Sequence, residues 1–293
     1  ITKTDIVSVE ITGSNVTRIG NYVFRHCSSL TSLTIPDSVR SIGESAFQAC
    51  SNLASVTIPD SVTSLGESVF MQCRSLVSVT IGDSVTSIGL HAFSECSSLA
   101  SVTIPDSVTS IGQNAFYLCT SLESVTIGNL VKSIGENAFS SCSNLASVTI
   151  PDSVETIGDY AFTGCSSLTS FTIPDSVTGI GNGAFNRCSY LASVTIGDSV
   201  TSIGDFAFNR CSRLATIYMS DTTRGNLGIT SFGVQSYKDS PSTTEIVDSA
   251  LNVVFRDSNG DVLHRAEVTG ELGSTSYSSD ISANAIVSVE ITG

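Results

Sequence analysis

The cysteines of this chain recur at one fixed interval, and this interval limits the folds that are possible. All nine cysteines lie 23 residues apart, and a phenylalanine stands three residues before each of them. The cysteines are Cys27, Cys50, Cys73, Cys96, Cys119, Cys142, Cys165, Cys188 and Cys211. A strict period of this length is typical of a solenoid, in which each unit buries its apolar side only against its neighbours.

Residues 50–72 show how one repeat is expected to fold. The run from Leu53 to Ile58 is rich in β-branched residues and ends at Pro59, which predicts a short strand. Because side chains alternate along a strand, Val56 and Ile58 are expected to point into the core. Ser55 and Thr57, which form the Ser-x-Thr pair, then point outward. The Pro-Asp-Ser sequence that follows favours a turn. The sequence predicts a mainly β solenoid with short helical or 3-10 turns, and a core of phenylalanine and cysteine.

The motifs of the repeat resemble a known family. Leu53-x-x-Val56-x-Ile58 matches the strand pattern of leucine-rich repeats. The 23-residue interval, Ile-Pro-Asp-Ser-Val, Ile-Gly and Ala-Phe-x-x-Cys resemble the BspA-like bacterial leucine-rich repeats. The resemblance covers residues 6 to about 219, and departs from many leucine-rich repeats by having a Pro/Gly-Asp-Ser turn in place of an asparagine ladder. It implies an extracellular or cell-surface bacterial protein that binds other proteins.

The ends of the chain differ from the repeats. The period fails after Met219, and an Asn-Gly turn joins two apolar runs near residue 260, which predicts a hairpin. Residues 286–293 repeat residues 6–13 letter for letter. We therefore expect a leucine-rich-repeat solenoid with capping units over 1–235, a linker and small β hairpin module over 236–285, and the start of a further repeat block over 286–293. The chain is then a monomeric fragment of a multi-block protein.

Composition and the lack of motifs exclude several classes of function. The 13 basic and 27 acidic residues give a net charge of −14, which argues against nucleic acid as a partner. No apolar stretch is long enough to predict membrane insertion. The repeats offer no phosphate loop, nucleophile elbow or zinc motif, so we expect no catalytic residues, no cofactor, no metal site and no enzymatic activity.

The regularly spaced cysteines and the aspartates of the turns could be reactive, but both have structural interpretations. The cysteines lie in the phase of the core, which favours buried free thiols over disulfides between neighbouring repeats. The aspartates of the turns recur from Asp37 to Asp198 with Asn129 among them. Asx-turn hydrogen bonds to the following backbone amides would explain both residue types, and weak calcium binding is the alternative.

The positions on either side of the core phenylalanine vary from repeat to repeat, while the strand and turn hardly change. They are either exposed loop sites that drift or the surface that meets a protein partner on a host or neighbouring cell, since Tyr and Arg are favoured at interfaces. On the second interpretation the candidate partner-binding residues are Tyr22, His26, His91, Tyr117, Tyr160, Arg187, Phe206 and Arg210. The predicted function is adhesin-like attachment.

The outward Ser-x-Thr face of the strands is the alternative working surface. Its uniform hydroxyls are expected to stabilise the sheet through cross-strand pairs. The face would also suit a periodic lattice such as ice or a glycan chain, with Thr57, Thr80, Thr103, Thr126 and Thr149 as the contact residues. The sequence predicts no aromatic or charged side chains on this face that would support a sugar site. A structural spacer that binds nothing is the remaining alternative.

Overall fold

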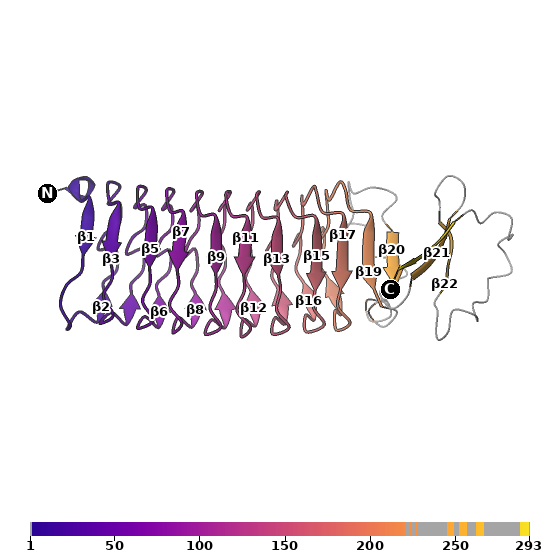
Figure 1. Ribbon diagram of the computed structural model, residues 1–293, viewed down its shortest axis with the longest axis horizontal. Coiled ribbons are helices and arrows are strands. Elements are labelled where there is room, and N and C mark those ends of the chain that lie inside the picture. The colour runs from indigo at the N-terminus through magenta and orange to yellow at the C-terminus, as the bar shows by residue number, and fades with distance from the viewer. Residues whose placement is uncertain are drawn as a thin grey trace.

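In the computed structural model, the chain winds into a rod of stacked repeats (Figure 1). The structure describes residues 2–220, 223 and 227, and the backbone of four later strands at 245–248, 252–256, 262–266 and 288–292. A one-turn 3-10 helix, η1 (Lys3–Asp5), precedes the first strand, and the repeats themselves consist of short strands and turns. The solenoid predicted from the 23-residue period is confirmed.

One side of the rod is formed by a short strand from each repeat. This is the strand that the β-branched run of the repeat predicts, and it carries the Ser-x-Thr pair. These front strands run parallel, and most of them pair with the strand 23 or 24 residues away, so that Ser124 lies beside Ser101 and Thr126 beside Thr103. They are β1 (Ser8–Glu10), β3 (Ser32–Thr34), β5 (Ser55–Thr57), β7 (Ser78–Thr80), β9 (Ser101–Thr103), β11 (Ser124–Thr126), β13 (Ser147–Thr149), β15 (Ser170–Ile173), β17 (Ser193–Ile196) and β19 (Thr216–Met219).

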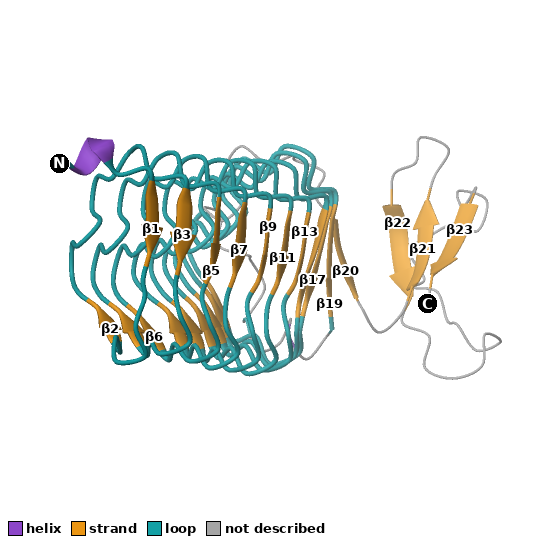
Figure 2. Ribbon diagram, turned by 60° about the vertical axis from the view of Figure 1, so that its left-hand side comes forward, coloured by secondary structure: helices purple, strands orange, loops and turns teal. Residues whose placement is uncertain are grey.

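A second line of parallel strands forms another side of the rod, as Figure 2 shows. Each of these strands has only two residues, which is too short for an alternation of apolar and polar residues to be visible, and the sequence did not predict them. They are β2 (Arg18–Ile19), β4 (Ser41–Ile42), β6 (Ser64–Leu65), β8 (Ser87–Ile88), β10 (Ser110–Ile111), β12 (Ser133–Ile134), β14 (Thr156–Ile157), β16 (Gly179–Ile180) and β18 (Ser202–Ile203).

The core between these sides is a column of phenylalanine rings beside a column of thiols. Successive rings from Phe24 to Phe208 stack with centroids 5.2–5.6 Å apart and planes within 10° of parallel. Offset stacking of this kind is a favourable arrangement of aromatic pairs. All nine cysteines are buried and free, as the preferred interpretation predicts.

The thiols also hold the repeats together. The Sγ atom of Cys119 donates a hydrogen bond to the carbonyl oxygen of Phe93 in the preceding repeat, at 3.2 Å. The same bond recurs from Cys50 to Cys211. Burial raises the pKa of these thiols above the ordinary value, to about 12 for Cys50 and Cys211. The fold therefore requires the protonated thiol, both as a donor and as a neutral group.

From β3 to β17, the turn after the front strand begins with Pro or Gly, and the order of these two residues along the rod controls how closely neighbouring repeats approach. A Cβ atom on Gly128 would lie 2.4 Å from the carbonyl oxygen of Pro105 in the preceding repeat, too close for any side chain. The same contact recurs at Gly82 and Gly197. Glycine is needed at these three positions because the backbone of the preceding proline repeat fills the space of a Cβ atom.

The close approach adds a hydrogen bond between repeats. Oδ1 of Asp106 accepts the backbone N–H of Asn129 at 2.7 Å. The pairs Asp60–Asp83 and Asp175–Asp198 make the same bond at 3.0 and 2.8 Å. The predicted Asx-turn bond within one turn is thus replaced, at these aspartates, by a bond to the turn of the next repeat.

Where proline follows proline, the front strands do not pair. Pro36 is followed by Pro59, and Pro151 by Pro174. The front sheet is interrupted at these two places, between β3 and β5 and between β13 and β15. Proline carries a Cβ atom and lacks an N–H, so it can neither approach the preceding turn as glycine does nor donate a bond across the gap.

The later strands extend the description beyond the repeats. β20 (Glu245–Asp248) pairs in parallel with β19, so the front sheet continues into the range expected to hold the linker and hairpin module. β21 (Asn252–Arg256) and β22 (Val262–Ala266) are antiparallel, as in a hairpin. β23 (Ser288–Thr292), in the segment that repeats residues 6–13, pairs antiparallel with β21.

Replacing Gly128 with alanine tests the role of the Pro-Gly order. The new methyl group must push the turn away from Pro105, and we expect the free energy of unfolding to fall by about 1–3 kcal/mol. Chemical denaturation measures this. Gly179→Ala is the matched control, because the nearest atom to its added Cβ would be the Ser202 hydroxyl oxygen at 3.1 Å and other repeats carry serine there. Equal loss in both variants would contradict the interpretation.

The raised pKa of the thiols predicts a specific dependence of stability on pH. An unfolded thiol loses its proton near its ordinary pKa of 9.0, whereas the folded Cys50 and Cys211 do so only near 12. Stability should be complete below about pH 9 and fall by about 1.4 kcal/mol per pH unit for each such thiol as the pH rises toward 12.

Urea denaturation from about pH 8 to about pH 11 measures this slope. Cys119→Ala should reduce the slope by the contribution of one thiol. Val108→Ala, which shortens another buried side chain, should lower stability without changing the slope. A slope that is the same in both variants would show that the thiols are not responsible.

Candidate functional site

The variable positions of the repeat lie at one edge of the rod and have an unusual backbone. We call the residues two before and two after each core phenylalanine, from Phe24 to Phe208, the variable edge. Sixteen of them have φ between 50° and 64°, in the left-handed region, and the other two are Gly164 and Gly183, whose φ is also positive. The left-handed residues other than glycine are Tyr22, His26, Ser45, Ala49, Ser68, Gln72, His91, Glu95, Asn114, Leu118, Asn137, Ser141, Tyr160, Arg187, Phe206 and Arg210.

Backbone hydrogen bonds between repeats impose this conformation. The N–H of His26 donates to the carbonyl oxygen of Gln48 at 2.8 Å, and the N–H of Tyr160 donates to that of Asn182 at 2.7 Å. Equivalent bonds run along the edge from repeat to repeat. Because these bonds involve only the backbone, the fold of the edge is the same whatever side chains it carries.

The structure places seven of the eight predicted partner-binding residues at left-handed positions of the variable edge. Tyr22, His26, Tyr160, Arg187 and Arg210 are exposed. The others, His91, Phe206 and Tyr117, are half-buried, and Tyr117 is the one residue of the eight outside the left-handed set. The eight are distributed from the first repeat to the last, so they form a line along the rod and no single pocket.

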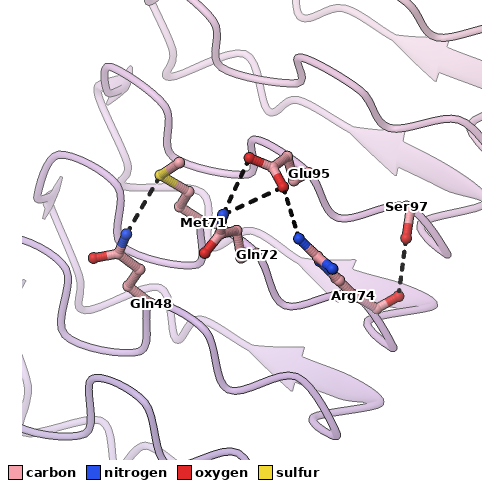
Figure 3. Close-up of polar contacts among 6 residues, drawn as sticks. All are labelled: Gln48, Met71, Gln72, Arg74, Glu95 and Ser97. Atoms are coloured by element: carbon pink, nitrogen blue, oxygen red, sulfur yellow. Dashed lines mark hydrogen bonds and ion pairs between the residues drawn. The ribbon is translucent and has the colours of Figure 1, made fainter.

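Side chains of the variable edge bond to side chains of neighbouring repeats, and sequence reasoning missed these pairs. Figure 3 shows Gln72 and Arg74 converging on Glu95. Nε2 of Gln72 lies 3.2 Å from Oε1 of Glu95, and the Arg74 guanidinium lies 3.1 Å from Oε2. Tyr22 donates to the Glu44 carboxylate, which raises the pKa of the tyrosine. The partners in these pairs are 21–23 residues apart, so a comparison of each position with its equivalent in the next repeat would have predicted them.

The C-terminal end of the edge carries positive charge. Arg187 and Arg210 occupy equivalent positions in neighbouring repeats, and both are exposed. The guanidinium of Arg213 lies 4.0 Å from the centre of the Tyr190 ring, a cation–π contact. In a chain with a net charge of −14, this end offers anionic groups a local site of attraction.

The alternative surface, the Ser-x-Thr face, is also exposed. Thr57, Thr80, Thr103, Thr126 and Thr149 all point outward from the front sheet. Among the residues that the structure describes, no hydrogen bond joins the hydroxyl groups of these five threonines to another side chain. The expected hydroxyl ladder is therefore not formed by them, and their hydroxyls remain available to a ligand.

Tyr218 corrects one expectation about this face. It pairs with Thr195 in the register of the front sheet, so its ring continues the outward line of threonines at β19. The face therefore does carry an aromatic platform, contrary to the prediction from sequence. The signal is present in the sequence, since Tyr218 follows Thr195 by 23 residues and so occupies the position of the outward threonines.

Within residues 2–220 and the other described positions, no cluster of three or more His, Cys, Asp or Glu side chains has an arrangement that would hold a metal ion. No helix in this part of the chain is long and apolar enough to cross a bilayer.

Comparison with known proteins places the chain in a family. The model of the family described as "BspA type Leucine rich repeat region (6 copies)" matches residues 2–122 and 109–240. No curated protein matches the chain.

Several solved structures of bacterial proteins are similar. A leucine-rich repeat protein of T. pallidum is 29% identical over 50% of this chain and 73% of that chain, with a TM-score of 0.42. One from Bacteroides ovatus is 26% identical over 84% of each chain, with a TM-score of 0.38. A leucine-rich cell surface protein from Faecalibacterium prausnitzii is 25% identical over 80% of this chain and 77% of that chain, with a TM-score of 0.38. Because the family model matches residues 2 to 240 of the 293, the chain belongs to the BspA-type leucine-rich repeat family.

Proposed function

We propose that this chain is a protein-binding scaffold on a bacterial surface, which attaches to proteins of a host, matrix or neighbouring cell through its variable edge. The observation that carries this proposal is the presence of sixteen side chains at left-handed positions. The family supports the surface location, since BspA-like repeats are associated with surface proteins.

A side chain at a left-handed position has an energetic cost. For residues other than glycine this conformation is less favourable by roughly 1–2 kcal/mol, whereas glycine adopts it freely. Unselected drift would therefore favour glycine along the edge. Glycine occurs at two of these positions, and one of them has a local reason, because a Cβ on Gly183 would lie 2.5 Å from the Tyr160 ring.

The kinds of side chain along the edge suit protein recognition. Tyr22 and Tyr160 are about 40% exposed, and Arg187 and Arg210 are exposed at the C-terminal end. Tyr and Arg are the residues that most often supply binding energy at protein interfaces. Because the repeats are stacked about 4.8 Å apart, a partner can contact several of them at once, and the contributions of weak contacts combine. A line of similar repeats supplies no unique catalytic constellation, so we propose no enzymatic activity.

The binding test compares the two surfaces of the rod. The whole chain is immobilised and its affinity for a panel of purified matrix and cell-surface proteins is measured by surface plasmon resonance. A variant with Tyr160→Ser and Arg187→Ser in the variable edge, and with Tyr117→Ser beside it, should lose at least about tenfold in affinity. A variant with Thr80→Lys, Thr103→Lys and Thr126→Lys should bind as the original chain does. Loss in the threonine variant alone would favour the lattice-binding alternative, and loss in neither would favour a spacer.

A second comparison tests the argument from the backbone. Tyr160→Gly and Tyr160→Ala remove the same ring, and both should weaken binding to the same extent. The glycine variant should be more stable than the alanine variant by about 1 kcal/mol, because only glycine relieves the left-handed strain. An alanine variant at least as stable as the glycine variant would show that the edge pays no cost for its side chains.

A further inference from the structure

A groove follows the outer edge of the front sheet over several repeats. One part, of about 800 Å³, lies over β13, β15 and β17, and includes Thr149, Thr172 and Thr195. A second part, of about 500 Å³, lies over the preceding repeats and includes Thr103 and Thr126. Thr149 lines both parts, so the two form one elongated groove parallel to the axis of the rod.

The walls of the groove have a consistent chemistry. The lining combines outward threonines of the front strands with turn residues, including Asp106, Asp152, Asp175 and Asp198. Buried apolar residues such as Ile173 also line the groove. Neither a lysine nor an arginine lines either part of the groove. Such a groove donates and accepts hydrogen bonds along its length and repels anions.

Aromatic surface lies at the C-terminal end of this groove. Tyr218 is in register with Thr195, one strand beyond the larger part of the groove, and its side chain is half-buried on the same outward face. The apolar face of a tyrosine ring can stack on the apolar face of a sugar, and the hydroxyl group at the edge of the ring can form a hydrogen bond. The larger part of the groove spans the interruption between β13 and β15, where Pro174 follows Pro151.

We propose that this groove binds a linear, neutral glycan chain, which lies along the axis of the rod and stacks one sugar ring on Tyr218. The spacing of the repeats, about 4.8 Å, is close to the length of one pyranose unit, so successive sugars meet a threonine and a turn residue, which is an aspartate in every repeat of the groove except that of Asn129. Carboxylates accept strong hydrogen bonds from sugar hydroxyls. This site is separate from the variable edge and does not depend on the function proposed for that edge.

Isothermal titration calorimetry of the whole chain tests the proposal with the β-1,4-linked hexamers of N-acetylglucosamine and of glucose. At least one of these neutral hexamers should bind, and at least about tenfold more tightly than its own dimer, because the hexamer spans several repeats. Absence of binding by both hexamers, or equal binding of dimer and hexamer, would overturn the proposal.

Variants at Tyr218 locate the site. Tyr218→Ala should weaken binding of the hexamer by about tenfold, whereas Tyr218→Phe, which keeps the ring, should retain most of the affinity. Tyr190→Ala is the control. It removes an exposed ring that lies outside the groove, against Arg213, and it should leave binding of the hexamer unchanged. Equal binding by the Tyr218→Ala variant, with its fold verified by circular dichroism, would overturn the assignment.

The deacetylated hexamer, which is cationic, distinguishes a glycan site from simple attraction to the aspartates. The neutral hexamers should bind with little dependence on salt, since neutral hydrogen bonds and stacking are hardly screened. Binding restricted to the cationic hexamer and lost at high salt would show that the groove only attracts positive charge, and would overturn the proposal.

Discussion

Hydrogen bonds between the backbones of neighbouring repeats are the constraint on which the rest of this structure depends. They fix the offset between repeats, and this offset places each phenylalanine on the one before it and each thiol on a carbonyl oxygen of the preceding repeat. The core is therefore a consequence of register. A slip of one residue would turn every Val and Ile of the front strands outward, so the repeat tolerates variation only where the side chain does not enter the core.

The variable edge is a consequence of the same constraint. Its N–H groups donate hydrogen bonds to the next repeat, and these bonds hold the residues two before and two after each core phenylalanine in the left-handed region whatever their side chains. In a single loop such strain would be relieved by a small local movement. In a stack, the repeats on both sides hold the strained conformation in place through their hydrogen bonds. Strained residues persist in folded proteins when the surrounding structure fixes them in this way. The solenoid can thus display Tyr, His and Arg in a conformation that isolated turns seldom hold.

The sequence predicted the features that repeat and missed those that depend on contacts between repeats. The period, the front strands, the buried Phe116 and the buried Cys119 all follow from the pattern within one repeat. The two-residue strands such as β10 and the Gln72–Glu95 bond do not, because each is defined by a neighbour 23 residues away. The same reason applies to the groove, whose walls come from different repeats. Tyr218 was within reach of sequence reasoning, because the interval from Thr195 predicts its position.

The order of proline and glycine in the turns adds information that the average repeat does not contain. A glycine after a proline closes the gap between two repeats and gains an Asp–amide bond, whereas a proline after a proline leaves the front strands unpaired. The interval of 23 residues makes the rod regular, and these pairs make it locally irregular. The larger part of the groove lies at one such pair, Pro151 and Pro174, in the repeat where the Phe171 ring packs edge to face against Phe185. A uniform stack would offer the same surface everywhere, so the position of a binding site on this rod depends on where the repeats depart from their own consensus.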